Sequence, residues 1–280
     1  MGAGARLVVL GVAQDGGHPQ AGCTRPCCEG AWRAGRRTRV ACLGLVTPTR
    51  RYLFDCTPDF PSQLRDVGGP PLDGILLTHA HMGHYTGLLH LGPEAWAPER
   101  VPVHAMPGMA AFLRQHAPWS AIVAEGHAEL VPLGADVPVD LGDGVTATPI
   151  LVPHRGPWSE TVAFRIAGPR GAALYLPDLD RWEDWDVDVP ALLATVDRAW
   201  VDGSFFGAGE VGWRDAAQIC HPLVEDTLRR FAGLPDALRA RISFLHLNHT
   251  NPLLDPASEA TRRVRDAGYA IAAEGEVLPL

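Results

Sequence analysis

The sequence predicts one α/β domain built from two β-sheets with helices on the outside. Two observations lead to this prediction. Short apolar runs rich in β-branched residues recur along the chain, and most end in glycine, proline, aspartate or histidine, as strands do where they enter loops. Helix-like stretches lie between these runs, and no composition shift, repeat or low-complexity linker divides the 280 residues. We therefore expect a single domain over residues 1–280.

Each expected strand is a run of β-branched, aliphatic or aromatic residues that is bounded by turn formers. The first run, residues 7–12, leads into Asp-Gly-Gly, so we interpret it as a strand entering a loop and not as a signal peptide. The other expected strands are 40–46, 52–55, 74–78, 101–105, 146–152, 161–166, 172–176, 198–201 and 242–247. The expected helices are 107–116, 190–195, 215–231 and 258–266.

Composition and charge narrow the classes of function. The formal net charge is −8, the pI is about 5.8, and no long basic run is present, so a nucleic-acid partner is disfavoured. No stretch approaches the roughly 20 apolar residues of a membrane span, so we expect no membrane partner and a cytoplasmic location. In that compartment the six cysteines should be reduced. A homodimer is compatible with these properties.

The segment THAHMGHYTG carries the strongest signal in the chain. It places His79, His81 and His84 directly after an apolar run, with the spacing H-x-H-x-x-H. Donors at the end of a strand and on the following turn can converge on one point, and imidazoles are common ligands of zinc and iron. A single histidine in such a place is most often structural, but three at this spacing indicate a metal site.

Three further donors follow other expected strands. His154 follows the run 146–152, Asp178 follows 172–176, and His246 lies in the final expected strand. Because several strand ends can meet at one edge of a sheet, we expect these side chains to join the three histidines.

These residues give the chain a resemblance to the metallo-β-lactamase superfamily, and within it to the B-protein family of pyrroloquinoline quinone biosynthesis. A second similar family is the cyclic-phosphate phosphodiesterase of the carbon–phosphorus lyase pathway. The resemblance implies an αββα sandwich with metals at one edge between the sheets. The segments that carry it are LGVAQDGGHPQAGC, FDCTPDF, LTHAHMGHYTGLLHLG, VPHRGPWSETVAF, VDGSFF and FLHLNHTNPLLDP.

The resemblance also implies ligand sets for two active-site metals. The first metal would take His79, His81 and His154, and the second would take His84 and His246, with Asp178 bridging both. The superfamily pattern H-x-H-x-D-H places an aspartate where this chain has Gly83. Losing that donor and its charge predicts a second active-site metal that is weakly bound or absent. The active-site ion could be zinc, iron or manganese.

A second cluster of donors lies near the N-terminus. The segment CTRPCC offers Cys23, Cys27 and Cys28, and His249 follows His246 by three residues. Three cysteines and a histidine form a closed structural zinc set, so we predict a structural zinc here. The related proteins use the spacing C-x-C-x2-C, so the match is imperfect, and reduced buried thiols are the alternative.

The predicted function is a metal-dependent hydrolase that uses a metal-bound hydroxide on a phosphodiester or an ester- or lactone-type small molecule. Asp178 and His221 are the candidate catalytic residues, with His221 protonating the leaving group as in related tRNA-processing endonucleases. The substrate is expected to be anionic. An iron-dependent oxygenase or hydroxylase is the alternative, and a non-catalytic scaffold is a third possibility.

Overall fold

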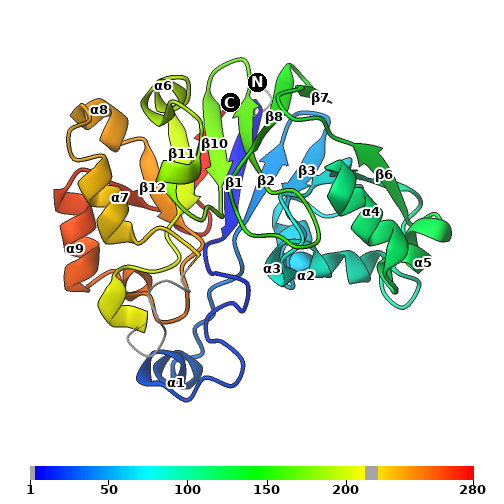
Figure 1. Ribbon diagram of the computed structural model, residues 1–280. Coiled ribbons are helices and arrows are strands. Elements are labelled where there is room, and N and C mark those ends of the chain that lie inside the picture. The colour runs from blue at the N-terminus through cyan, green and yellow to red at the C-terminus, as the bar shows by residue number, and fades with distance from the viewer. Residues whose placement is uncertain (1–3, 212–219) are drawn as a thin grey trace.

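The structure is a computed structural model that describes residues 4–211 and 220–280. Two seven-stranded sheets face one another in the centre (Figure 1). In spatial order, the first sheet contains β14 (Val277–Pro279), β1 (Arg6–Gly11), β2 (Cys42–Val46), β3 (Arg51–Phe54), β4 (Gly74–Leu76), β5 (Val101–Ala105) and β6 (Ala128–Pro132). The second contains β13 (Ala270–Ile271), β12 (Ile242–Leu245), β11 (Arg198–Asp202), β10 (Ala172–Leu176), β9 (Val162–Ala167), β8 (Val145–Leu151) and β7 (Val139–Gly142).

Helices cover the outer faces of both sheets (Figure 1). The first sheet is covered by α2 (Phe60–Asp66), α3 (Met82–Tyr85), the 3-10 helix η1 (Thr86–Leu91), α4 (Pro107–Gln115) and α5 (Trp119–Ala124). On the other side lie α6 (Val189–Ala194), α7 (Val224–Arg230), α8 (Asp236–Arg239) and α9 (Glu259–Asp266). The helix α1 (Pro26–Arg33) lies apart from both layers, at the end of an extended segment that follows β1.

Three hydrophobic clusters hold these layers together. The central cluster joins the inner faces of the two sheets, where Phe54 of β3 packs edge-on against Phe164 of β9 with ring centroids 5.4 Å apart. One outer cluster packs α2, α4 and α5 against the first sheet, and the other packs α6, α7 and α9 against the second. This layering is the expected αββα sandwich.

Strand direction brings many carboxyl ends to one edge of the sandwich. In the first sheet, β1 and β3 both run antiparallel to β2, and β4 runs parallel to β3. In the second, β8 and β10 both run antiparallel to β9, and β10, β11 and β12 are mutually parallel. The loops that leave β1, β3, β4, β8, β10, β11 and β12 therefore emerge together, at the lower edge in Figure 1.

The ten expected strands are all present, with ends shifted by one or two residues in most cases. The expected helix over 215–231 is wrong for residues 220–223, which are not helical, because Pro222 disfavours the α conformation of the residue before it. Residues 215–219 lie outside the described residues. Across 4–211 and 220–280, no helix combines the length and apolar character needed to cross a bilayer.

Candidate metal centre

The first group of donors lies between β4 and the loops after β8 and β10. Nε2 of His79 is 2.8 Å from Nδ1 of His81, which is 3.1 Å from Nε2 of His154. The Asp178 carboxylate completes the group, 3.7 Å from His154 and 3.8 Å from His79. Two imidazole nitrogens on one tetrahedral zinc stand about 3.4 Å apart, given bond lengths near 2.0–2.1 Å. The structure thus brings the predicted first ligand set together at separations near those that one ion requires.

The second group shares Asp178 with the first. Nε2 of His84 and Nε2 of His246 face each other at 3.3 Å, and Oδ2 of Asp178 lies 3.1 Å and 3.6 Å from them. A further carboxylate is present, because Oδ1 of Asp15 lies 3.3 Å from His84 and 3.7 Å from His246. The predicted donor set of the second site, Asp178, His84 and His246, did not include this carboxylate. The prediction of a weak or absent second metal was based on Gly83 alone and did not count Asp15.

Hydrogen bonds on the far side of the rings orient these histidines. The Thr78 hydroxyl donates to Oδ1 of Asp55, so its oxygen accepts from Nδ1 of His79 at 3.0 Å. Oδ2 of Asp55 accepts from Nδ1 of His84 at 2.7 Å. Each bond fixes the tautomer that leaves Nε2 with a free lone pair aimed into the cluster, an arrangement typical of metal-binding histidines. Asp55 thus orients one histidine of each group.

In the second sheet, the Ser204 hydroxyl lies 3.0 Å from Nδ1 of His246 and orients that ring in the same way. Oδ1 of Asp180 lies 2.8 Å from Nδ1 of His154, but the two atoms lack the geometry of a hydrogen bond. His246 itself has φ of 62°, in the left-handed region that non-glycine residues rarely adopt. A residue held in this conformation at a cluster of ionisable groups is typical of a functional site.

The electrostatics of the cluster suit a cation. Burial opposes ionisation of Asp178, yet the neighbouring imidazoles of His246, His79 and His84 hold its pKa well below the usual range. Burial lowers the pKa of His79, and burial with the neighbouring His154 lowers that of His81 to about 4, so both rings are neutral at pH 7. Across the described residues, Oδ2 of Asp178 is buried without a well-formed hydrogen bond. Burial opposes protonation of His84, yet the Asp55 and Asp178 carboxylates raise its pKa well above the usual value. The carboxylates among these imidazoles therefore attract positive charge, which matches the donor chemistry of a divalent-ion site.

His221 lies beside both groups. Its Nδ1 is 2.7 Å from Oδ2 of Asp202, 3.1 Å from the Ser204 hydroxyl and 3.9 Å from Oδ1 of Asp178. Burial would lower the pKa of His221, but the Asp202 carboxylate outweighs it and raises the pKa to about 9. The ring is therefore protonated at neutral pH, which is the state that a general acid requires.

The cysteine cluster also assembles. The helix α1 begins at Pro26, so Cys27 and Cys28 lie in its first turn, while Cys23 lies in the loop before it. One donor atom each from these three cysteines and His249 lies within 4.8 Å of the others. Nδ1 of His249 is 3.4 Å from Sγ of Cys28 and 4.0 Å from Sγ of Cys27. A sulfur and a nitrogen on one tetrahedral zinc stand about 3.6 Å apart, so the adjacent cysteines both fit.

Protonation in the cysteine cluster is consistent with this geometry. Burial, with the neighbouring Cys23 and Cys27, raises the pKa of the Cys28 thiol to about 12. Three crowded thiolates are therefore unfavourable without a cation to compensate them. Burial and Arg25 lower the pKa of His249, so its ring is neutral and can donate a lone pair.

Comparison with known proteins supports the fold. The family model described as a beta-lactamase superfamily domain matches residues 50–272. The chain belongs to the metallo-β-lactamase superfamily. Its curated relatives include coenzyme PQQ synthesis protein B of Xanthomonas campestris pv. campestris, 26% identical over 96% of this chain and 98% of the relative, and that of Methylobacterium nodulans, 28% identical over 98% of this chain and 100% of the relative.

Solved structures share the superfamily fold over nearly the full chain. Zinc-bound PqqB from Methylobacterium extorquens has a TM-score of 0.84 at 22% identity, covering 98% of this chain and 100% of that one. A diphosphatase of the PhnP family has a TM-score of 0.72 at 23% identity, covering 98% of this chain and 96% of that one. These identities establish the fold and not the reaction.

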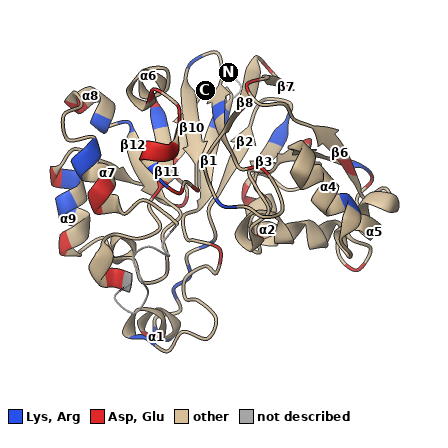
Figure 2. Cartoon of the chain, viewed as in Figure 1, with Lys and Arg blue, Asp and Glu red and all other residues tan. Residues whose placement is uncertain are grey.

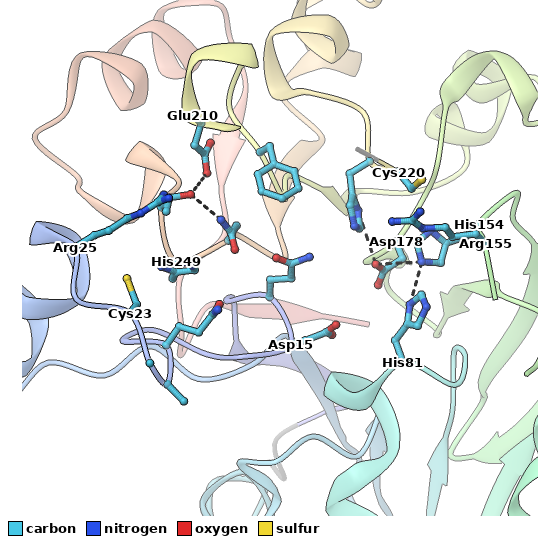
Figure 3. Close-up of a pocket in the computed structure, with 18 of the residues that line it drawn as sticks. Asp15, Cys23, Arg25, His81, His154, Arg155, Asp178, Glu210, Cys220 and His249 are labelled. Carbon is cyan, nitrogen blue, oxygen red and sulfur yellow. Dashed lines mark hydrogen bonds and ion pairs between the residues drawn. The ribbon is translucent and has the colours of Figure 1, made fainter. Parts of the chain in front are cut away.

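A cavity of about 520 Å³ opens over the edge of the sandwich where these donors lie (Figure 3). His81, His154 and Asp178 lie at one end, and Cys23 and His249 lie towards the other. The lining also includes Arg25, Arg155, Glu210 and His221. The loop that carries the cysteines thus forms one wall of the pocket that contains the candidate metal ligands.

Sequence reasoning missed Asp15, Asp180 and Ser204. Asp15 did carry a signal, since it is an acidic residue on a glycine-rich loop directly after the first strand. Asp180 and Ser204 follow strand ends, as the predicted ligands do, but nothing local distinguishes them from ordinary loop residues. Asp55 belongs to the quoted segment FDCTPDF, and its carboxylate lies against Nδ1 of His84.

Proposed function

We propose that this protein is a metal-dependent hydrolase that cleaves an anionic phosphodiester or an ester- or lactone-type small molecule. One observation carries the proposal. Two groups of imidazole and carboxylate donors share Asp178 on the floor of a pocket, and hydrogen bonds on the far side of His79, His84 and His246 direct their inner nitrogens towards the cluster. Divalent ions bound there would lower the pKa of a water towards about 7 and polarise the acceptor oxygen of the substrate.

In this proposal, two sets of histidines would each hold one ion, and Asp178 would contact both ions. His79, His81 and His154 would hold one ion, and His84 and His246 would hold the other. Asp178 reaches both groups and would set the distance between the ions. Because Asp178 is buried among imidazoles, its carboxylate is already ionised and oriented before substrate arrives.

His221 supplies the proton that the reaction consumes. It carries a proton at pH 7, lines the pocket and lies 3.9 Å from Asp178. Cleavage of a phosphodiester or an ester leaves an alkoxide, which departs readily only if it is protonated as the bond breaks. We assign this protonation to His221, with Asp202 holding the ring in position.

Two guanidinium groups in the pocket, together with bound cations, would suit an anionic substrate. Arg25 and Arg155 line the pocket at opposite ends, and Arg155 follows the candidate ligand His154 directly. Guanidinium groups bind phosphate and carboxylate oxygens well. Outside the pocket, arginines of α7 and α9 lie beside acidic residues, as in the pairs Arg230–Glu183 and Arg263–Glu225 (Figure 2). This interspersed surface supports a small-molecule substrate over nucleic acid.

We also propose that Cys23, Cys27, Cys28 and His249 hold a structural zinc. All six cysteines are free thiols in the structure, which supports a reducing, cytoplasmic location. The zinc would fix the extended segment that carries α1 and forms the pocket wall.

The test combines metal analysis with turnover. Protein purified anaerobically is analysed for metal content and then assayed with bis(4-nitrophenyl) phosphate, simple esters and lactones. The expected result is metal-dependent hydrolysis of one class, abolished by chelation and restored by zinc or manganese. The matched control is His81→Ala, which should lose both metal and turnover. Metal-replete protein that hydrolyses none of these compounds would reject the proposal.

An iron-dependent oxygenase is the second candidate. It is supported by the likeness over nearly the full chain to proteins named for coenzyme PQQ synthesis. Three histidines and a carboxylate also suit ferrous iron. The same anaerobic preparation distinguishes the two, because an oxygenase would contain iron and consume O₂ in the presence of its substrate, whereas a hydrolase would not.

A further inference from the structure

Residue 83 is a glycine for a steric reason. A Cβ atom built on Gly83 would lie 2.2 Å from Oδ1 of Asp15 and 2.6 Å from the Cα atom of Asp15. Real Cβ contacts do not reach these separations, and the second is to a backbone atom that no side-chain rotation can move. The glycine is not needed for its backbone, because Gly83 is absent from the positive-φ residues found across 4–211 and 220–280. Asp15 therefore fills the space that a side chain at position 83 would occupy.

Asp15 places its carboxylate on the second donor group. Its Oδ1 lies 3.3 Å from Nε2 of His84 and 3.7 Å from Nε2 of His246. Within the described residues, this oxygen is a buried polar atom without a well-formed hydrogen bond. Asp178 also lies 3.1 Å from His84 and 3.6 Å from His246, so this pair of imidazoles has a carboxylate from each of two separate segments beside it. Figure 3 shows Asp15 reaching into the pocket from the loop after β1.

The backbone holds Asp15 in this place. The N–H of Gln14 donates to the carbonyl of Leu247 at 2.9 Å, and the N–H of Gly17 donates to the carbonyl of Gln14 at 2.7 Å. Leu247 directly follows His246, so the two segments that carry Asp15 and His246 are bonded to each other. The carboxylate is thus positioned before any ion binds, which reduces the free energy needed to order the site.

We infer that Asp15 is a ligand of the second metal. Because Gly83 has no side chain, there is room for this ligand from the loop after β1, in place of a ligand on helix α3. The inference rests on the proposed function only in assuming that cations occupy these groups. Two carboxylates then offset much of the charge of two divalent ions, so both sites should be filled in the purified protein.

Removing the carboxylate tests the assignment. Asp15→Ala should bind one ion fewer per chain and lower the affinity for that ion by more than about 100-fold, since even outer partners of metal ligands contribute about 10- to 100-fold. The measurements are metal analysis and titration with Co²⁺, in which the thiolate absorption band reports the cysteine cluster separately. The control is Glu210→Gln, which removes a negative charge from the same pocket but should keep every ion.

Adding a methyl group at position 83 tests the steric part of the inference, namely that a side chain there would displace Asp15. Gly83→Ala changes no donor, yet it should displace Asp15 and weaken the second site. In the Asp15→Ala background the same substitution should have little further effect, because the residue that it displaces no longer ligates. Met82→Ala is the control on the same helix, since Met82 is exposed and should not alter metal affinity.

The outcomes separate this inference from the proposed function. Asp15→Ala protein that keeps both active-site ions at wild-type affinity would overturn the inference and leave the function standing. Wild-type protein with a single active-site ion would overturn it too. Two bound ions that disappear as predicted in Asp15→Ala, with no hydrolysis by the wild type, would reject the function and leave the assignment of Asp15 intact.

Discussion

Nδ1 of His221 lies 2.7 Å from Oδ2 of Asp202, and this ion pair joins a residue from the loop before α7 to the end of β11. Oδ2 of Asp202 also accepts the N–H of Leu179, and its Oδ1 accepts that of Ser204. Asp202 is therefore fixed by the backbone of two neighbouring loops and presents a rigid anion to the imidazole. The pair sets both the orientation and the charge of His221.

Replacing His221 should slow turnover without removing metal. His221→Asn is expected to lower kcat by about 10²- to 10⁴-fold for substrates with alkoxide leaving groups, because general acid catalysis contributes about that much. The loss should be far smaller for a 4-nitrophenolate leaving group, which needs no proton. Equal losses for both leaving groups, or the loss of an ion, would show that His221 acts differently, for example as a ligand.

The pH profile should report the same pair. The pKa of His221 is raised to about 9 from an ordinary 6.5, so the acid is present below about pH 9 and lost above it. The stabilising contribution of the ion pair is likewise complete below 6.5 and falls as the pH rises through 9. Asp202→Asn should move the alkaline limb of kcat towards neutral pH. An unchanged limb in this variant would contradict the assignment of that limb to His221.

The first metal should depend on His81. His81→Ala removes a nitrogen that lies 2.8 Å from His79 and 3.1 Å from His154, so one metal equivalent per chain should be lost. His116→Ala serves as the control, because that exposed histidine hydrogen-bonds within its own helix at 2.9 Å. Unchanged metal content in His81→Ala, measured after dialysis against a weak chelator, would contradict the ligand set.

Loss of the cysteine-bound zinc should lower stability. Cys28 is fully buried, and Cys28→Ser should release zinc and reduce the free energy of unfolding by roughly 4 kcal/mol, a size typical of lost metal sites. Thermal unfolding with and without chelator measures the effect. Cys56→Ser is a matched control, because Cys56 is equally buried but lies outside the cluster, so its unfolding should stay insensitive to chelator.

Cys28→Ser should also affect the active site. Cys28 lies in the first turn of α1, and Asp15 lies on the segment that joins β1 to that helix, so a loosened cluster should also weaken the second active-site ion. We expect Cys28→Ser to lower the affinity of that site while leaving the ion held by His79, His81 and His154 in place. Titration with Co²⁺ measures both, and an unaltered second site would show that Asp15 is positioned independently of the cluster.

Sequence reasoning works best where the signal is local. The β-branched runs predicted the strands, and three histidines within six residues at a strand end predicted a group of donors that the fold brings together. It failed for the four edge strands β6, β7, β13 and β14, which are short and show no clear pattern. It also failed for Asp15, because only the folded chain brings the loop after β1 against helix α3. Asp202 appeared in a quoted motif, but its bond to His221 depends on a loop far along the sequence.

The contact between Asp15 and Gly83 has a consequence for recognising such chains in genomes. A search pattern that demands an aspartate immediately before the third histidine would discard this sequence as a degenerate member without a complete centre. A pattern that accepts glycine there, when an aspartate stands in the glycine-rich loop after the first strand, would retain it. The aspartate after the first strand and the glycine before the third histidine would then be read together as one feature. Sequences that lack the usual aspartate could be sorted by whether they carry both residues.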